Sequence, residues 1–401
     1  MKKFIITGGN FLNTGAAAMS YITIYELRKR YPDCEIYMAI DYGDGKKHPE
    51  LNCRIAYLLG DSMKLINHRL SFSGFVKAII KMIIGRENIF LQVRRFKRIV
   101  RDCDAAFDVS GYILSSQWEE KSNLDKLAQM NCILNYQKPY FILPQSFGPF
   151  DYKNKSYVTG KIRETLSRCS IVYAREHEGY ILLKNDLDLK NVLFSYDMVL
   201  QNKEVDWKLV LNETEETTPI QMDFSSNNVA LIPNMRLIDH DANVMLVERY
   251  VKMINKLLEL GKKIYLISHS FEDTVLCKQI KDFFAQDCSV VLLKEKMTSR
   301  EFETIIQNME FAIASRYHSI VHSYKNGIPC IILGWAVKYR ELAEEFGQNE
   351  YVFDTSSLTN ASESIISAIE KMNSNLEEEK KKIHRTIQEI QKSNCFDNLD
   401  F

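Results

Sequence analysis

Short apolar runs alternate with stretches of helical periodicity along almost the whole chain. In the first half, runs of strand length follow one another, and most end in a polar or glycine-containing turn. Amphipathic stretches with helical spacing lie between them. This alternation predicts a parallel sheet flanked by helices. The predicted strands are KKFIITGG, CEIYMAID, CDAAFDVSG, PYFILPQSFGPF, SIVYARE and NVLFSYDMVL.

A second alternation of the same kind begins near residue 228, with the apolar runs NVALIPN, KIYLISHS, CSVVLLK, FAIAS and GIPCIILG. The polar stretch NETEETTPIQMDFSSNN separates the two halves. The pattern therefore predicts an α/β fold of two Rossmann-like domains facing each other across a cleft, a GT-B-like arrangement. We expect the domains at 1–205 and 229–375, a linker at 206–228 and a charged C-terminal helix at 376–401.

A basic segment, residues 74–101, does not fit a plain α/β domain. It contains one acid, Glu87, and apolar residues nearly surround its first two lysines. One interpretation is a helical insertion in the first domain, at about 70–101, with a solvated basic face. The other is an interfacial helix that contacts an anionic membrane or a lipid-diphosphate head group. Its eight basic residues are Lys77, Lys81, Arg86, Arg94, Arg95, Lys97, Arg98 and Arg101.

Composition excludes several classes of protein. Fifty-two basic and fifty-two acidic residues cancel, so no overall charge attracts the chain to nucleic acid. Nine cysteines without a CxxC pair argue against a disulfide framework or a structural zinc site. No apolar run has the length of a signal peptide or a transmembrane helix. We expect a cytoplasmic protein, at most peripheral to the inner face of a membrane, without a metal or cofactor.

The strongest chemical signal lies in ASRYHSIVHSYKNGIPCIILGWAVKYRELAEEFG, residues 314–347. Its pattern predicts strand, helix and strand, which places Arg316 and His318 at a strand's carboxyl end and in the first helical turn. Open parallel sheets bind ligands at that position. Arg316 is a candidate clamp for phosphate or carboxylate, or else an ion-pair partner at the helix start. His318 is a candidate proton donor or base.

Other candidates surround this pair in the predicted cleft. Lys338, in the next loop, either reaches the same ligand or is a solvated lysine. Arg175 ends a strand of the first domain and is the candidate cation from across the cleft. His322, one turn after His318, either packs in the core or orients His318. The remaining candidates for substrate contact are Asn13 and Gly15, in a glycine loop that resembles a phosphate cradle or simply makes a turn, and Gln145, Ser146, Arg236 and Asp241.

The segment SRYHSIVHSYKNGIPCIILGWAVKYRELAEEFG resembles the C-terminal signature of the polysaccharide pyruvyl transferase family. NTGAAAM, DVSG, PQSFGPF, VYAREHEGYILL and YDMVL agree with the family in the same order, so the resemblance spans about residues 4–350. The chain departs from the family where NTGAAAM lacks an aspartate after the glycine and DVSGYIL lacks a glycine run.

The resemblance implies that the pyruvyl group of phosphoenolpyruvate is transferred to two hydroxyls of a sugar as a cyclic ketal. Such chemistry needs a proton for the methylene carbon, a base for the attacking hydroxyl and cations around the trianionic donor. Arg175, Arg316, His318 and Lys338 are the implied catalytic residues. The acceptor is then a sugar of a cell-surface polysaccharide precursor, free or as a lipid-linked oligosaccharide.

Two other functions remain open from the sequence. A GT-B glycosyltransferase that uses a nucleotide sugar would have the same architecture. Such enzymes often carry two glutamates eight residues apart, and Glu295 and Glu303 have this spacing, but they lie upstream of the strand that ends at Arg316. A non-catalytic sugar-binding protein would leave the cluster of arginine, histidine and lysine without a role.

Overall fold

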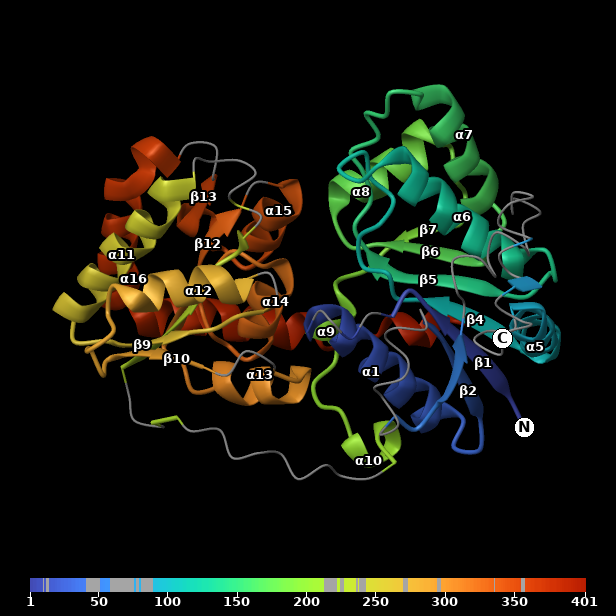
Figure 1. Cartoon of the computed structure of the whole chain (residues 1–401), viewed down its shortest axis with the longest axis horizontal. Helices are drawn as coiled ribbons and strands as arrows, with labels where there is room; N and C mark the ends of the chain where they lie inside the picture. Colours follow the sequence, from blue (N-terminus) through green and yellow to red (C-terminus); the bar gives the residue numbers. More distant parts are fainter. Residues whose placement is uncertain are drawn as a thin grey trace.

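The chain forms two α/β bodies, each built on a parallel sheet (Figure 1). This agrees with the predicted fold class of two Rossmann-like domains. The computed structural model describes residues 1–9, 11, 14–40, 51–57, 76, 79–80, 89–212, 222–223, 227–235, 237, 243–269, 273–293, 297–334, 336–354 and 358–401.

The first body contains a seven-stranded sheet with the order β3-β2-β1-β4-β5-β6-β7. All neighbouring strands are parallel. Every residue of β4 and β5 is buried, as expected for central strands covered by helices on both faces. The strands are β1 (Lys3–Thr7), β2 (Glu35–Ile40), β3 (Arg54–Tyr57), β4 (Ala105–Asp108), β5 (Tyr140–Gln145), β6 (Ile171–Ala174) and β7 (Val192–Phe194).

Helices follow most strands of the first body. The run predicted as one strand up to Leu200 is instead split, because the Asp197 side chain accepts a hydrogen bond from Val199 N (2.8 Å) and caps a short helix. The helices are α1 (Thr14–Arg30), α5 (Ile89–Asp102), α6 (Glu120–Leu134), α7 (Lys155–Leu166), α8 (His177–Ile181) with its π-helical continuation (Leu182–Asp186), α9 (Met198–Gln201) and α10 (Trp207–Val210).

The second body contains a six-stranded parallel sheet with the order β10-β9-β8-β11-β12-β13. Its central strand β8 is buried along its whole length. The strands are β8 (Asn228–Ile232), β9 (Lys263–Leu266), β10 (Val290–Leu292), β11 (Phe311–Ala314), β12 (Cys330–Gly334) and β13 (Val352–Asp354).

One helix of the second body, α13, begins at a polar cap. Thr298 and Glu301 form a reciprocal capping box at the start of α13, so two backbone N–H groups are satisfied there. The helices are α11 (Asn243–Glu259), α12 (Asp273–Asp282), α13 (Ser299–Ile306), α14 (Tyr317–Lys325), α15 (Val337–Glu345), a 3-10 turn (Asn349–Tyr351) and α16 (Leu358–Ile390).

The C-terminal helix is longer than predicted and connects the two bodies. Instead of beginning at residue 376, α16 begins at Leu358, because buried Ile365, Ile369 and Met372 continue the apolar periodicity of its second half. The chain then returns to the first body (Figure 1). There the Phe401 ring lies 5.2 Å from the rings of Phe4 and Phe107.

The predicted insertion and linker are only partly described. In the insertion, α5 buries Phe96 and Val100 against the first sheet, and residues 70–75, 77–78 and 81–88 lie outside the described part. The linker begins with α10 and an isolated bridge between Leu51 and Leu211, while 213–221 and 224–226 are not described. Within the described residues, no helix is both long and apolar enough to cross a bilayer.

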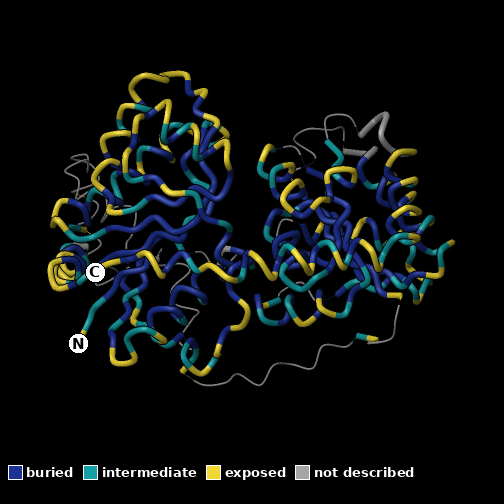
Figure 2. Tube along the Cα trace, turned by 180° about the vertical axis from the view of Figure 1, so that it is seen from behind, coloured by how far each residue is buried: buried dark blue, intermediate teal, exposed yellow. Residues whose placement is uncertain are grey.

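The two bodies are in direct contact. One apolar cluster runs from beneath the first sheet through α9 and α14 to the second sheet, and includes residues of the C-terminal segment. Helix α14 of the second body contacts α9 and α1 of the first. Buried residues follow both sheets and continue where the bodies meet (Figure 2). Side chains at the facing strand ends therefore lie close to one another.

Candidate active site

Charged side chains gather where strands of both sheets end. Arg175 directly follows β6, Arg316 lies between β11 and α14, and Lys338 is in the first turn of α15 after β12. The ring of Tyr317 joins the two bodies, because its centroid lies 4.2 Å from the Arg175 guanidinium carbon and 5.5 Å from Lys338 Nζ. Side chains from both domains thus meet at the carboxyl ends of the strands.

Arg175 is buried, and polar partners lie around its guanidinium in addition to the Tyr317 ring. Its Nη1 donates to Asp197 Oδ2 at 2.7 Å, and its Nε and Nη2 donate to Ser146 Oγ at 3.0 and 2.8 Å. Ser146 Oγ in turn donates to Glu176 Oε1 at 2.7 Å. Burial raises the pKa of Glu176, although Arg175 opposes this shift. The guanidinium is therefore held in one orientation by two buried carboxyl groups.

Arg316 forms an ion pair, which was one of the two roles predicted for it from the sequence. Its Nε and Nη2 donate to Asp273 Oδ2 and Oδ1 at 3.0 and 2.6 Å, a bidentate contact with the first residue of α12. The Asp273 side chain is completely buried. The pair fixes the orientation of the Arg316 guanidinium.

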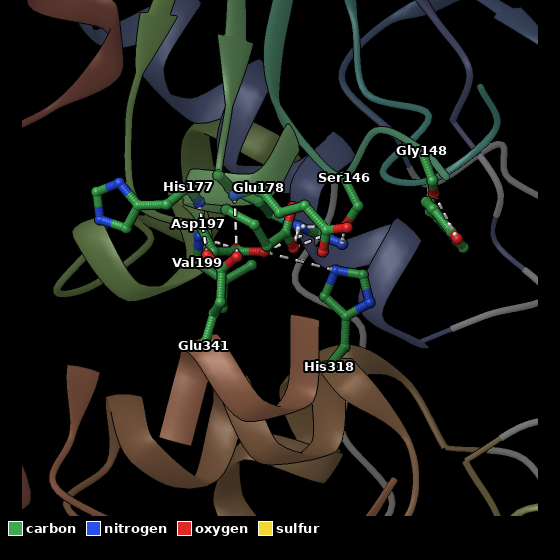
Figure 3. A network of polar contacts seen from close by, with 11 residues as sticks. Ser146, Gly148, His177, Glu178, Asp197, Val199, His318 and Glu341 are labelled. Carbon is green, nitrogen blue, oxygen red and sulfur yellow. Dashed lines mark hydrogen bonds and ion pairs between the residues drawn. The ribbon is translucent and has the colours of Figure 1, made fainter. Parts of the chain in front are cut away.

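His318 reaches across from α14 into the first body (Figure 3). A Cβ on Gly15, at the start of α1, would lie 2.1 Å from His318 Cγ, so only glycine allows the imidazole to occupy this position. Gly111 lies on the Cε1 side of the ring. Burial and the nearby Arg175 charge lower the pKa of His318 well below its usual value. The imidazole is therefore neutral at pH 7.

Lys338 is the cation with the least charge compensation. Its Nζ lies 4.0 Å from the centroid of the Tyr112 ring, and no carboxylate of the described residues is within ion-pair distance. Burial, followed by the Arg175 charge, lowers the pKa of Lys338 to about 7, and Glu176 opposes the shift. The amine can therefore change its protonation state near neutral pH.

His322 lies deeper in the second body than His318. It is buried, with Nδ1 3.6 Å from Glu303 Oε1 and the ring edge-on to Phe302. His269, which follows β9, also packs edge-on against Phe302, with ring centroids 5.0 Å apart. Burial and the Arg316 charge lower the pKa of His269 to about 3. In the described part of the chain, no three His, Cys, Asp or Glu side chains are arranged to hold a metal ion.

A cavity of about 150 Å³ opens beside Lys338, between the loops that follow β4, β5, β6 and β12. Ser146 lies in its wall, whereas Gln145 is buried beside it with an Oε1 that has no hydrogen-bond partner among the described residues. The lining includes Tyr112, Gln117, Phe147, Glu176, Glu178 and Lys338.

Hydrogen bonds also link the two bodies beside the site. The Glu341 carboxylate of α15 accepts from the backbone N–H groups of His177 and Glu178 at 2.5 and 2.9 Å, at the start of α8 (Figure 3). Tyr196 Oη donates to Glu345 Oε1 at 2.7 Å. These hydrogen bonds link α15 of the second body to residues that follow β6 and β7 of the first.

Several predicted residues cannot be compared with the structure, and several residues of the site were not predicted. Asn13, Arg236 and Asp241 lie outside the described residues. The sequence did not predict the acidic residues that orient the cations, which are Glu176, Asp197 and Asp273. It also did not predict His269, the second histidine after a strand. Their only signal in the sequence is a position within the second half of a predicted strand run, which holds for Glu176, Asp197 and His269 but not for Asp273.

A sequence model of the polysaccharide pyruvyl transferase family matches residues 13–336. This range contains Gly15, Arg175, Arg316 and His318 and ends two residues before Lys338. No curated protein sequence matches the chain significantly.

Solved structures similar to this chain show the GT-B arrangement of two Rossmann-like domains. The UDP-GlcNAc 2-epimerase from Neisseria meningitidis bound to UDP-GlcNAc has a TM-score of 0.58 and 11% identity, with 96% of this chain and 94% of the other covered. The UDP-GlcNAc 2-epimerase from Methanocaldococcus jannaschii has a TM-score of 0.57 and 14% identity, with 92% of each chain covered. Anabaena HepE in complex with UDP and glucose has a TM-score of 0.52 and 11% identity, with 98% of each covered. At these identities the similarity concerns the fold alone.

Proposed function

The chain belongs to the polysaccharide pyruvyl transferase family, and on this basis we propose that it transfers the pyruvyl group of phosphoenolpyruvate to a sugar of a cell-surface polysaccharide precursor. Two hydroxyls of the sugar attack the same carbon of the donor, a cyclic ketal forms and phosphate leaves. The observation that carries the proposal is the meeting of Arg175, His318 and Lys338, from both domains, around the ring of Tyr317.

The charges of the site suit a small trianionic donor. Arg175 and Arg316 are held in fixed orientations by buried carboxylates, and Lys338 lies beside the cavity. Two nine-residue helices, α14 and α15, also begin here, and their N-termini favour anions. We infer that these groups bind the phosphate and carboxylate of the donor and stabilise the phosphate as it leaves.

The protonation states suggest how the proton transfers are divided. Neutral His318 accepts the proton of the first attacking hydroxyl as that oxygen bonds to the donor carbon that bears the phosphate. Protonated Lys338 delivers a proton to the methylene carbon, which becomes the methyl group of the ketal. The C–O bond to phosphate then breaks, the second hydroxyl bonds to the same carbon, and its proton leaves with the phosphate.

Donor affinity is expected to fall as the pH rises above neutrality. The pKa of Lys338 is lowered to about 7, and a bound trianion favours the charged amine, so binding takes up a proton. Above this pKa the affinity for phosphoenolpyruvate should fall by up to about tenfold per pH unit. Calorimetry between pH 7 and 9 measures the change. Lys338→Arg, which stays charged, should show little pH dependence, and an equally flat profile for the parent protein would contradict the assignment.

The alternative function is transfer of a sugar from a nucleotide sugar, because the similar folds include UDP-sugar enzymes. The two glutamates of the sequence prediction give it little support. Glu295 lies outside the described residues, and Glu303 is paired with Lys325 and faces His322. Calorimetric titration with phosphoenolpyruvate, UDP-glucose and GDP-mannose distinguishes the two. Binding of a nucleotide sugar without phosphoenolpyruvate would reverse our preference.

We also propose that the acceptor is lipid-linked and that the basic segment brings the protein to the inner face of the membrane. On α5, the side chains of Arg94, Arg95, Lys97 and Arg98 are exposed, and none has an ion-pair partner among the described residues. Val76, Ile80 and Leu91, which are large apolar side chains, are also exposed in this segment. Basic and aliphatic groups together are typical of surfaces that bind anionic lipids.

Reversing the four charges Arg94, Arg95, Lys97 and Arg98 to glutamate should abolish most binding to anionic vesicles, because each basic residue near such a surface contributes about 1 kcal/mol. Co-sedimentation with vesicles of phosphatidylglycerol and phosphatidylcholine measures the loss. Reversal of Lys380, Lys381 and Arg385, which are basic residues of α16, is the control. If the α5 variant sediments like the parent protein, the basic face has only a structural role.

A further inference from the structure

The imidazole of His318 has a buried nitrogen without a hydrogen bond. Its Nε2 has no partner among the described residues, although it is shielded from solvent. Buried polar groups are nearly always paired, so this nitrogen calls for an explanation. The ring itself cannot turn freely, because Gly15 lies against Cγ and Nδ1 and Gly111 lies near Cε1. A partner for this nitrogen is therefore to be sought among the groups that it faces.

Asp197, on the opposite body, is the group that this nitrogen faces. The distance between His318 Nε2 and Asp197 Oδ2 is 3.9 Å, and the side chain of His318 points from α14 toward Asp197 (Figure 3). A shortening of about 1 Å would produce an ordinary hydrogen bond. Asp197 precedes α9 in the first body and His318 belongs to α14 of the second, so a shift of about 1 Å between the two bodies would bring these atoms within hydrogen-bond distance.

Asp197 itself is held at two points. Its Oδ1 accepts from Val199 N at 2.8 Å, and its Oδ2 accepts from Arg175 Nη1 at 2.7 Å. The carboxylate is completely buried. A carboxylate oxygen accepts more than one hydrogen bond, so Oδ2 can serve Arg175 and His318 together. One oxygen atom then connects the proposed donor-binding cation to the proposed base.

We propose that Asp197 is the positioning residue for His318, and that a His318–Asp197 pair is completed across the cleft when the domains close on the donor. This inference rests on the proposed function. A hydrogen bond from Nε2–H to Oδ2 keeps the proton on Nε2 and leaves the Nδ1 lone pair to accept the hydroxyl proton. After that transfer, the carboxylate stabilises the imidazolium. Without Asp197, the charged ring would face mainly other cations.

The charges around the ring give the expected direction of any pH effect. Asp197 is the negative group in this set, so its removal should make the imidazolium less stable. The groups that face His318 from the packed elements are Arg175, Asp197, Lys338, His269 and His322.

Nitrogen NMR of the imidazoles tests the pair without any turnover, and the chain contains only eight histidines to assign. In the parent protein with phosphoenolpyruvate, His318 should be the Nε2–H tautomer. In Asp197→Asn, which keeps the helix cap because asparagine caps equally well, the tautomer should shift toward Nδ1–H and the pKa of His318 should fall. If His318 of the parent protein is instead the Nδ1–H tautomer, the proposal is wrong, and this result does not depend on whether the variant folds.

Kinetics separate an action through His318 from an effect on structure. Asp197→Asn should lower kcat about 10²-fold, as expected when a reacting group loses its alignment, and should move the acid limb of the kcat profile to lower pH. In a His318→Gln background the same change should cost less than about twofold, because residues that act as a unit are not additive. Asp206→Asn, at the matching cap of α10, should leave kcat unchanged.

Each outcome decides a different question. If Asp197→Asn lowers kcat in the His318→Gln background as much as it does in the parent protein, Asp197 acts through Arg175 or through the fold. That result would overturn the proposed His318–Asp197 pair. If the parent protein forms no ketal with any acceptor, the proposed function fails, while the NMR result still decides whether His318 and Asp197 interact.

Discussion

Replacing His318 by alanine is expected to lower turnover by roughly 10²–10⁴-fold, the range for losing a general acid–base group. Affinity for phosphoenolpyruvate should change little, because the imidazole is neutral at pH 7 and adds no charge to the site. Initial rates at saturating donor give the turnover, and calorimetry gives the affinity.

Two variants control this result. His318→Gln keeps a polar side chain of similar size against Gly15 and should be as inactive as the alanine variant. His384→Ala, at an exposed position of α16, should be fully active. Turnover near that of the parent protein in a folded His318→Ala variant would show that the histidine is structural.

Replacing Arg175 by alanine should destabilise the protein by roughly 3–5 kcal/mol, the usual cost of removing one partner of a buried ion pair. The variant would leave Asp197 and Glu176 buried without the guanidinium that lies between them. Urea unfolding followed by circular dichroism measures the loss. Because alanine disturbs the fold, the contribution of Arg175 to donor binding is better measured with Arg175→Lys, which should bind phosphoenolpyruvate more weakly since the planar fork is lost.

Lys190→Ala is the matched control for the stability measurement. Lys190 also pairs with an aspartate, Asp188, but both side chains are exposed, and solvent screens such pairs. Its removal should leave the unfolding curve almost unchanged. If Arg175→Ala unfolds like Lys190→Ala, the buried network does not hold the strand end together.

Most of the fold was predictable because its strands are buried on both faces and read as continuous apolar runs. The exceptions have local reasons. β3 and β13 are edge strands of four and three residues, too short to stand out from their surroundings. The run ending at Leu200 looks like one strand, but Asp197 caps a helix within it. The first half of α16 has fewer charged residues than its second half, whose run of charges made that part recognisable as a helix.

The site was predictable where a residue's position along the chain determines its place in the fold. A strand end in a parallel sheet is such a position, so Arg175, Arg316, His318 and Lys338 could be named from the sequence. Their partners could not, because pairs such as Arg316 with Asp273, 43 residues apart, depend on how separate units pack. For the same reason, the sequence could not show whether Arg316 is a clamp for phosphate or carboxylate or forms an ion pair within the protein.

The formation of a pyruvate ketal tests the central claim most directly. The protein should be incubated with phosphoenolpyruvate and a panel of lipid-linked oligosaccharides, with mass spectrometry of the sugars and measurement of phosphate. We expect an acceptor to gain one pyruvyl group as a ketal, with one phosphate released per ketal, and both products to form at least about 10²-fold more slowly with His318→Ala. Transfer of a sugar from a nucleotide sugar to the same panel, without any ketal from phosphoenolpyruvate, would contradict the account.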